Sequence, residues 1–347
     1  MVTAMRSMFF LLLAFLLLAG CASPRGDSLL LVDNSLNMVW PPPPETPRIK
    51  LLRIISGPED VIPQSTAMQR FFEYVTGEKR GGAPFVTPAG LVADGEGIIY
   101  VVDTLGKGVH KYDLINRDVS FISTVGAEPF VSPVAVALDG AGVLYVVDSV
   151  TAKVYKLDKS GESLGEMAKD EQRFQRPTGI TVTHEGVKYV VDALARKVLV
   201  FDKSDVFLRA FPVNAADNLL IRPTNVTVDA DGTVYVTDAF DFSVKVFSPD
   251  GTFLHRIGEI GDAPGYFARP KGVAVDTDRH LYVVDGNFNN FQIFDNKGGA
   301  LLYVGKTGND PGQFMLPNGI FIDTKDRIYV SDSYNRRIQI FQYLKGR

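Results

Sequence analysis

The pattern Tyr-Val-x-Asp occurs six times along the chain. Its copies end at Asp103, Asp148, Asp192, Asp238, Asp285 and Asp332, which are 45, 44, 46, 47 and 47 residues apart. A proline stands fifteen residues before each aspartate, at Pro88, Pro133, Pro177, Pro223, Pro270 and Pro317. The whole unit therefore repeats, and a period of this length is typical of a structure built from stacked or radially arranged copies.

Each unit contains four β-rich runs separated by Asp, Asn and Gly. In the fifth unit the runs are residues 272–276, 280–285, 291–295 and 301–305. Asp, Asn and Gly are the residues that tight hairpin turns require. Four short antiparallel strands in every unit describe one blade of a β-propeller. The sequence therefore predicts an all-β fold, a six-bladed β-propeller of four-stranded antiparallel blades.

The unit resembles the NHL repeat, which runs P-x-G-(apolar)-x-(apolar)-D, then YVxD, then N-x-R-(apolar)-x-(apolar)-F. The sixth unit matches best, with residues 317–323 followed by Asn335, Arg337 and Phe341. Two units depart from the pattern, since Ala135 replaces the glycine in unit 2 and Thr183 replaces the turn aspartate in unit 3. The resemblance spans residues 49–343 and implies the same six-bladed propeller.

The last unit has only three strands, because the chain ends soon after residues 337–342. Residues 50–56, Lys-Leu-Leu-Arg-Ile-Ile-Ser, resemble the fourth strand of blade 4 at residues 253–258. We expect this N-terminal strand to pair with the last strand and close the ring. Apolar residues at positions 68, 71, 72 and 75 predict one short amphipathic helix, at about residues 64–77, in the insert before blade 1. The propeller domain is thus predicted to span residues 49–347.

The first twenty residues have the features of an export signal. Arg6 precedes an apolar run from Met8 to Leu18, which is short for a membrane span. Leu18-Ala19-Gly20-Cys21 resembles a bacterial lipobox, which implies a lipidated Cys21 and a membrane anchor. The alternative is an ordinary secretory signal with an incidental cysteine. Because Ala22 follows the cysteine, the resemblance favours the outer membrane of the bacterial envelope, in either leaflet.

Residues 21–48 are interpreted as a tether, and its four prolines at positions 41–44 predict a stiff polyproline spacer. Trp40 and the leucines before it are too apolar for a freely solvated linker. Two alternatives stay open: this segment docks on its own domain, or Trp40 and the prolines contact a partner.

The residues argue against nucleic-acid binding, a histidine metal site and a serine nucleophile. The net charge of −4 argues against nucleic acid, and Cys21 is the only cysteine. His110, His184, His255 and His280 fall at unlike positions of the repeat, so no metal or other cofactor is expected. Ser163 lies in a GxSxG sequence, but in a strand-to-strand hairpin where a nucleophile elbow needs a strand-to-helix turn. The strand-end aspartates recur in every unit, so we expect them to accept backbone N–H bonds from the loops that follow them. We predict no catalytic residue.

The chain direction gives the propeller two unlike faces. One face carries the first and third hairpins of each blade and is acidic; we call it the hairpin face. The other carries the connections between strands two and three and the crossings between blades; we call it the crossing face. Aromatic, amide and basic residues gather there on blades 4 to 6, and such side chains dominate interface energies. The predicted binding residues are Phe240, Asp241, Phe288, Asn289, Tyr334, Asn335, Arg336, Arg269 and Lys271.

The sequence thus favours a lipid-anchored propeller that binds an envelope protein or a glycan on its crossing face. One alternative is that these loop residues only pack on the neighbouring blade. The alternative function is a lactonase- or lyase-type enzyme, with a channel metal held by Asn225, Asn318 and a strand-end aspartate.

Overall fold

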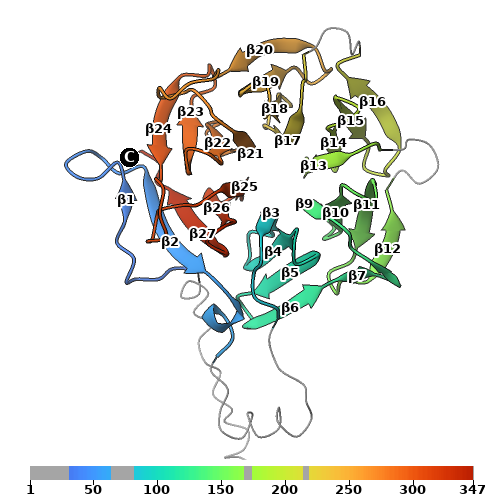
Figure 1. Ribbon diagram of the computed structural model, residues 1–347, viewed down its shortest axis with the longest axis horizontal. Coiled ribbons are helices and arrows are strands. Elements are labelled where there is room, and N and C mark those ends of the chain that lie inside the picture. Colours follow the sequence, from blue (N-terminus) through green and yellow to red (C-terminus); the bar gives the residue numbers. More distant parts are fainter. Residues whose placement is uncertain (1–30, 64–81, 168–173, 214–218, 347) are drawn as a thin grey trace, which may run out of the picture.

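A computed structural model describes residues 31–63, 82–167, 174–213 and 219–346, and these form a ring of six blades (Figure 1). Blade 1 contains β3 (Pro88–Ala93), β4 (Ile98–Asp103), β5 (Gly108–Asp113) and β6 (Asp118–Ile122). Blade 2 contains β9 (Pro133–Leu138), β10 (Leu144–Asp148), β11 (Lys153–Leu157) and β12 (Ser163–Glu166). Blade 3 contains β13 (Pro177–Val182), β14 (Lys188–Asp192), β15 (Lys197–Phe201) and β16 (Phe207–Phe211).

The second half of the ring follows the same order. Blade 4 contains β17 (Pro223–Val228), β18 (Val234–Asp238), β19 (Ser243–Phe247) and β20 (Phe253–Ile257). Blade 5 contains β21 (Pro270–Val275), β22 (Leu281–Asp285), β23 (Asn290–Phe294) and β24 (Ala300–Val304). Blade 6 contains β25 (Pro317–Ile322), β26 (Arg327–Asp332) and β27 (Arg337–Tyr343). A small ribbon of β7 (Thr124–Val125) and β8 (Glu128–Pro129) links blades 1 and 2, and η1 (Pro58–Asp60) is a single 3-10 turn. The predicted all-β six-bladed propeller is confirmed.

The N-terminal strand completes blade 6, as predicted. β2 (Ile49–Ile55) pairs antiparallel with β27, from Ile49 opposite Tyr343 to Ile55 opposite Ile338. β1 (Val39–Trp40) adds a fifth strand outside β2, which the sequence analysis missed. The first and last parts of the chain therefore share one sheet, and this sheet closes the ring (Figure 1).

The expected stiff polyproline spacer is wrong. Trp40 lies opposite Ile49 in the β1–β2 pair, so residues 41–48 turn the chain back on itself. The Trp40 ring packs edge-on against Phe341 of β27, with 5.7 Å between ring centroids. Of the two alternatives for Trp40, the contacts therefore favour docking on its own domain. The predicted helix at residues 64–77 lies outside the described residues.

The hydrophobic core is divided among the spaces between blades. In the described part of the chain, six clusters of buried side chains each join two neighbouring blades. Strand β2 contributes to two of them, since Ile49 and Leu51 enter the cluster between blades 5 and 6, and Leu52 and Ile55 enter the one between blades 6 and 1. The ring is thus stabilised by apolar burial on both sides of every blade.

Candidate functional site

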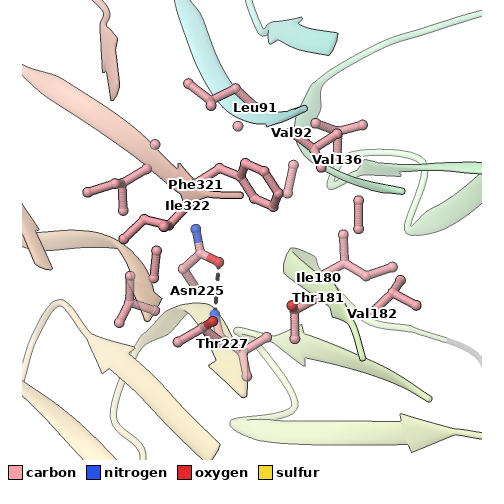
Figure 2. A pocket seen from close by; sticks show the side chains of 18 of the residues that line it. Leu91, Val92, Val136, Ile180, Thr181, Val182, Asn225, Thr227, Phe321 and Ile322 are labelled. Carbon is pink, nitrogen blue, oxygen red and sulfur yellow. Dashed lines mark hydrogen bonds between the residues drawn. The ribbon is translucent and has the colours of Figure 1, made fainter. Parts of the chain in front are cut away.

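The first strand of each blade lines a central channel (Figure 1). Inside it lies a cavity of about 200 Å³ with mostly aliphatic walls, and the ring of Phe321 extends into it (Figure 2). The polar side chains among its lining residues are Thr181, Asn225 and Thr227. No carboxylate, imidazole or thiol is among these lining residues, so their side chains offer few ligands to a metal ion.

A second cavity, of about 350 Å³, lies at the crossing-face end of the channel, and we call it the channel mouth. Gly90, Asn225 and Gly319 line both cavities, so the two meet at these residues. All six blades contribute to the channel mouth, whose lining residues are Thr87, Ala89, Gly90, Thr104, Leu105, Val134, Thr178, Thr224, Asn225, Lys271, Asn318, Gly319 and Ser333. Lys271 is the charged member of this set.

The glycine of the P-x-G motif lets the first strands of neighbouring blades approach closely. A Cβ atom on Gly90 would lie 2.7 Å from the Cα atom of Ala135, and one on Gly272 would lie 2.7 Å from the carbonyl oxygen of Asn318. Contacts this short are excluded, so the first strands of neighbouring blades approach each other there only through glycine or a small residue. Blade 4 carries Asn225 at this position, and its side chain extends into the channel (Figure 2).

The strand-end aspartates hold the loops of the crossing face in place. Asp285 accepts backbone N–H bonds from Asn287 and Phe288, at 2.9 Å each, as expected from its following loop. It also accepts bonds from the backbone of Ala268 at 2.7 Å and Arg269 at 2.9 Å, in the crossing that precedes its blade. Equivalent bonds from the preceding crossing reach Asp103, Asp148, Asp192, Asp238 and Asp332.

These aspartates are poor candidates for ligand binding, because their oxygens already accept hydrogen bonds and their side chains are buried. The structural role predicted for them is therefore confirmed. Their hydrogen bonds to the crossing that precedes each blade were not predicted. A strand-end aspartate would have to give up these bonds to hold a channel metal.

Two of the predicted aromatic residues are freely exposed on the crossing face. Phe240 is 60% exposed and Tyr334 is 65% exposed, while Phe288 is half-buried. The guanidinium of Arg222 lies 5.2 Å from the centre of the Phe240 ring, a cation–π contact. Exposed aromatic rings beside arginine are typical of protein and ligand interfaces.

Positive charge stands next to the channel mouth at one repeated position. The residue directly before the repeat proline is an exposed arginine in blades 3, 4 and 5, at Arg176, Arg222 and Arg269. Arg336 is also exposed, on the strand connection of blade 6. Lys271 lies at the mouth itself, where burial, with a smaller contribution from Arg269, lowers its pKa to about 8.

Two predicted binding residues, both asparagines, are instead engaged in internal hydrogen bonds. Asn289 is buried, donates to the Thr307 hydroxyl at 2.9 Å and accepts from the backbone of Leu316 at 2.7 Å. Asn335 donates to the carbonyl of Gly308 and to Asp332, both at 2.9 Å. These amides shape the loops and are not free to recognise a ligand.

Asp241 is likewise occupied. It accepts hydrogen bonds from Ser243 at 2.8 Å and from Lys245, and both partners are buried. Burial acts on the pKa of Asp241 in the opposite sense to these hydrogen bonds, and the net effect is a pKa below its usual value. Its carboxylate therefore stabilises the blade 4 connection that presents Phe240.

Acidic residues of the hairpin face form the same hydrogen bonds in several blades. Asp276 accepts backbone bonds from Asp278 at 3.0 Å and His280 at 2.8 Å, and its other oxygen accepts from the hydroxyl of Tyr282 at 2.9 Å. The same aspartate-to-tyrosine bond, six residues apart, occurs in blades 2, 4 and 6. The Asp and Tyr residues recur six positions apart in the sequence, and this spacing is the signal that could have predicted the bond.

The structure places the histidines and the GxSxG sequence on different elements of the blades. The four histidines lie on β5, β20 and two first hairpins, and within the described residues no three His, Cys, Asp or Glu side chains gather as a metal site would require. Ser163 begins β12, after a hairpin turn. Cys21 lies outside the described residues, and in the remainder no helix is long and apolar enough to cross a membrane.

Comparison with known proteins supports the fold. A sequence family described as a six-bladed β-propeller matches residues 208–287 and 276–345. No curated protein sequence matches the chain significantly.

Many solved structures share the architecture. A streptogramin B lyase is 13% identical, with a TM-score of 0.56 over 76% of this chain and 96% of the other. An auxiliary nutrient-binding protein from Bacteroides thetaiotaomicron is 13% identical, with a TM-score of 0.58 over 75% and 70%. A gluconolactonase from Xanthomonas campestris is 15% identical, with a TM-score of 0.58 over 75% and 87%. At these identities the likeness concerns the fold, because one fold serves many functions. The chain is a six-bladed β-propeller.

Proposed function

We propose that this protein is a lipid-anchored binding module of the bacterial envelope, which holds an anionic glycan or an acidic protein segment on its crossing face. The observation that carries the proposal is that Phe240, Tyr334 and several arginines are exposed on the loops of the crossing face, the face on which the channel mouth opens. Aromatic rings supply apolar contact area and the arginines supply charge, so together they favour a large anionic ligand. The hairpin face, with its acidic turns, would repel the same ligand.

The envelope location rests on the lipobox-like sequence that ends at Cys21. Lipidation there would tether the propeller to a membrane, and Ala22 favours the outer one. The nutrient-binding protein among the similar structures is compatible with a propeller that serves as a binding module in the envelope.

The proposal is tested by capture from native envelope extracts. We expect Phe240→Ala and Tyr334→Ala to lose captured material, because a buried aromatic anchor is worth about 2 kcal/mol or more. The matched control is Asp231→Ala, which changes an exposed residue of the hairpin face. Equal capture by the three variants and the unaltered protein would place the binding surface elsewhere.

One observation favours the alternative, a metal-dependent lactonase- or lyase-type enzyme. Asn225 and Asn318 both line the channel mouth, as that alternative requires. A metal there would need a carboxylate ligand in addition, and no acidic residue is among the lining residues of the mouth. Metal analysis of the purified protein, followed by activity with lactones, would distinguish this enzyme from the binding module.

A further inference from the structure

The channel mouth contains hydrogen-bond donors that have no partner among the residues that the structure describes. The ammonium group of Lys271 makes no hydrogen bond or ion pair with any residue that the structure describes, and neither does the side-chain amide of Asn318. The side chain of Asn225 accepts a hydrogen bond through Oδ1 from the backbone of Val226 at 2.8 Å, and its Nδ2 atom donates to no residue in the described part of the chain. Asn225, Lys271 and Asn318 come from the adjacent blades 4, 5 and 6, in that order.

The hydroxyl groups of the channel mouth differ from these donors, because several of them already form hydrogen bonds within the protein. Thr224 lies 3.0 Å from the hydroxyl of Thr237, and Thr178 donates weakly to the carbonyl of Pro223 at 3.5 Å. Ser333 donates to the carbonyl of Pro88. They form a polar wall with acceptor capacity left over, which suits the hydroxyl groups of a ligand.

Lys271 lacks a counter-ion at this site. Its neighbours in the mouth are threonine, asparagine, serine, glycine and apolar residues, all uncharged, and Arg269 on its own crossing adds positive charge. Burial of an unpaired ammonium is unfavourable. Consistent with this, its pKa is lowered to about 8. An anion placed at the mouth would supply the missing partner.

The donor set discriminates between kinds of anion. Phosphate sites in proteins typically combine arginine or lysine side chains with several backbone N–H groups, which together match the charge of a phosphate. The channel mouth has one ammonium group and no arginine among its lining residues, which matches the single charge of a carboxylate, and the amides of Asn225 and Asn318 are left for the hydroxyl groups of a ligand. The cavity of about 350 Å³ is at the small end of ligand pockets, so it accommodates one sugar ring more readily than a chain.

We propose that the channel mouth binds one sugar acid, free or at the end of a glycan, with its carboxylate on Lys271 and its hydroxyl groups toward Asn225 and Asn318. This inference rests on the proposed function, since it names the chemistry that the crossing face recognises at its centre. The exposed aromatic residues around the mouth would contact the rest of a longer glycan.

The test is calorimetric titration of the purified protein with glucuronate, glucose and glucose 6-phosphate at pH 7. We expect glucuronate to bind about tenfold or more tightly than glucose, since a hydrogen bond to a charged group is lost with the neutral sugar. A glucuronate-terminated oligosaccharide that binds better than the monosaccharide would indicate a glycan end as the natural ligand; equal affinity would indicate the free sugar acid. Tighter binding of glucose 6-phosphate than glucuronate would overturn the assignment to a carboxylate.

Variants separate the role of Lys271 from general charge. Lys271→Met and Lys271→Gln are expected to abolish the preference for glucuronate over glucose. Lys297→Met, an exposed change on the hairpin face, should leave the preference unchanged. Circular dichroism confirms that each variant is folded. A preference retained in both Lys271 variants would overturn the inference.

The pH dependence gives a second readout. At pH 9.5 most of the free protein carries a neutral Lys271, so glucuronate affinity should fall about tenfold or more, while glucose affinity stays constant. If glucuronate does not bind, but envelope capture still depends on Phe240 and Tyr334, the sugar-acid inference fails and the binding proposal stands. If neither holds, both fail.

Discussion

Removal of the N-terminal strand should open the ring at blade 6. Strand β2 covers the outer edge of β27, and its Ile49, Leu51 and Ile55 side chains are fully buried. They lie in two different core clusters, on either side of the blade. A chain that begins at Gly57 would therefore expose an unpaired strand edge and apolar surface on both sides of blade 6.

The magnitude follows from burial. Burying one Leu or Ile side chain contributes about 1.5–3 kcal/mol, so three contribute roughly 5–9 kcal/mol. This is comparable with the whole stability of a typical domain, about 5–15 kcal/mol. The shortened chain should therefore be unfolded or strongly destabilised. The milder change Leu51→Ala should cost about 2–5 kcal/mol.

Thermal unfolding followed by circular dichroism measures both changes, with full-length protein and Leu301→Ala as controls. Leu301 lies on the outer strand β24 of blade 5 and is 53% exposed, so its loss should change the free energy of unfolding by about 0.5 kcal/mol or less. An unchanged Tm for the chain that begins at Gly57, or equal effects of Leu51→Ala and Leu301→Ala, would refute the role of β2 in closing the ring.

Three other changes test further parts of the structure. Lys271→Met should raise the free energy of unfolding at pH 7 by about 1–3 kcal/mol, because the buried ammonium is disfavoured. The folded-state pKa of about 8 lies below the unfolded value of 10.5, so the stability of the unaltered protein rises between these two pH values. Urea titrations should therefore show that the difference between the two proteins vanishes above pH 10.5. Asp285→Ala should lower the free energy of unfolding by about 2 kcal/mol or more, because backbone donors are left unpaired, whereas Asp278→Ala on the exposed hairpin should lower it little. Equal midpoints of unfolding in urea would contradict the role of Asp285 in holding the two loops. Cys21→Ser should remain in the soluble fraction without acyl label, and a labelled, membrane-bound variant would disprove lipidation there.

Local repetition explains why so much of the architecture could be predicted. The Tyr-Val-x-Asp strands and their spacing fix the blade number, and the likeness of residues 50–56 to a fourth strand predicted the closure that β2 makes. Strand β1 was missed because two residues, Val39 and Trp40, are too short to show an alternating pattern beside four prolines. Its position depends on the tertiary contact with Phe341.

The site was only partly predictable for the same reason. Phe240 and Tyr334 lie on loops of the crossing face, as expected, because the repeat fixes which loop they occupy. Asn289 and Asn335 occupy the same kind of loop, but their amides bond to residues 18 and 27 positions away, which no local pattern reveals. That Lys271 has no partner among the described residues is also a property of the assembled ring, since residues from all six blades line the channel mouth around it.

Oxidative footprinting tests the location of the binding surface most directly. The purified protein is labelled alone and together with the material that it captures from envelope extracts, and the oxidation of individual aromatic residues is quantified. We predict that Phe240 and Tyr334 are protected by the captured ligand, while Tyr303, which is 59% exposed on the outer strand of blade 5, is labelled equally in both samples. Protection of Tyr303 with unchanged labelling of Phe240 and Tyr334 would contradict a binding site on the crossing face.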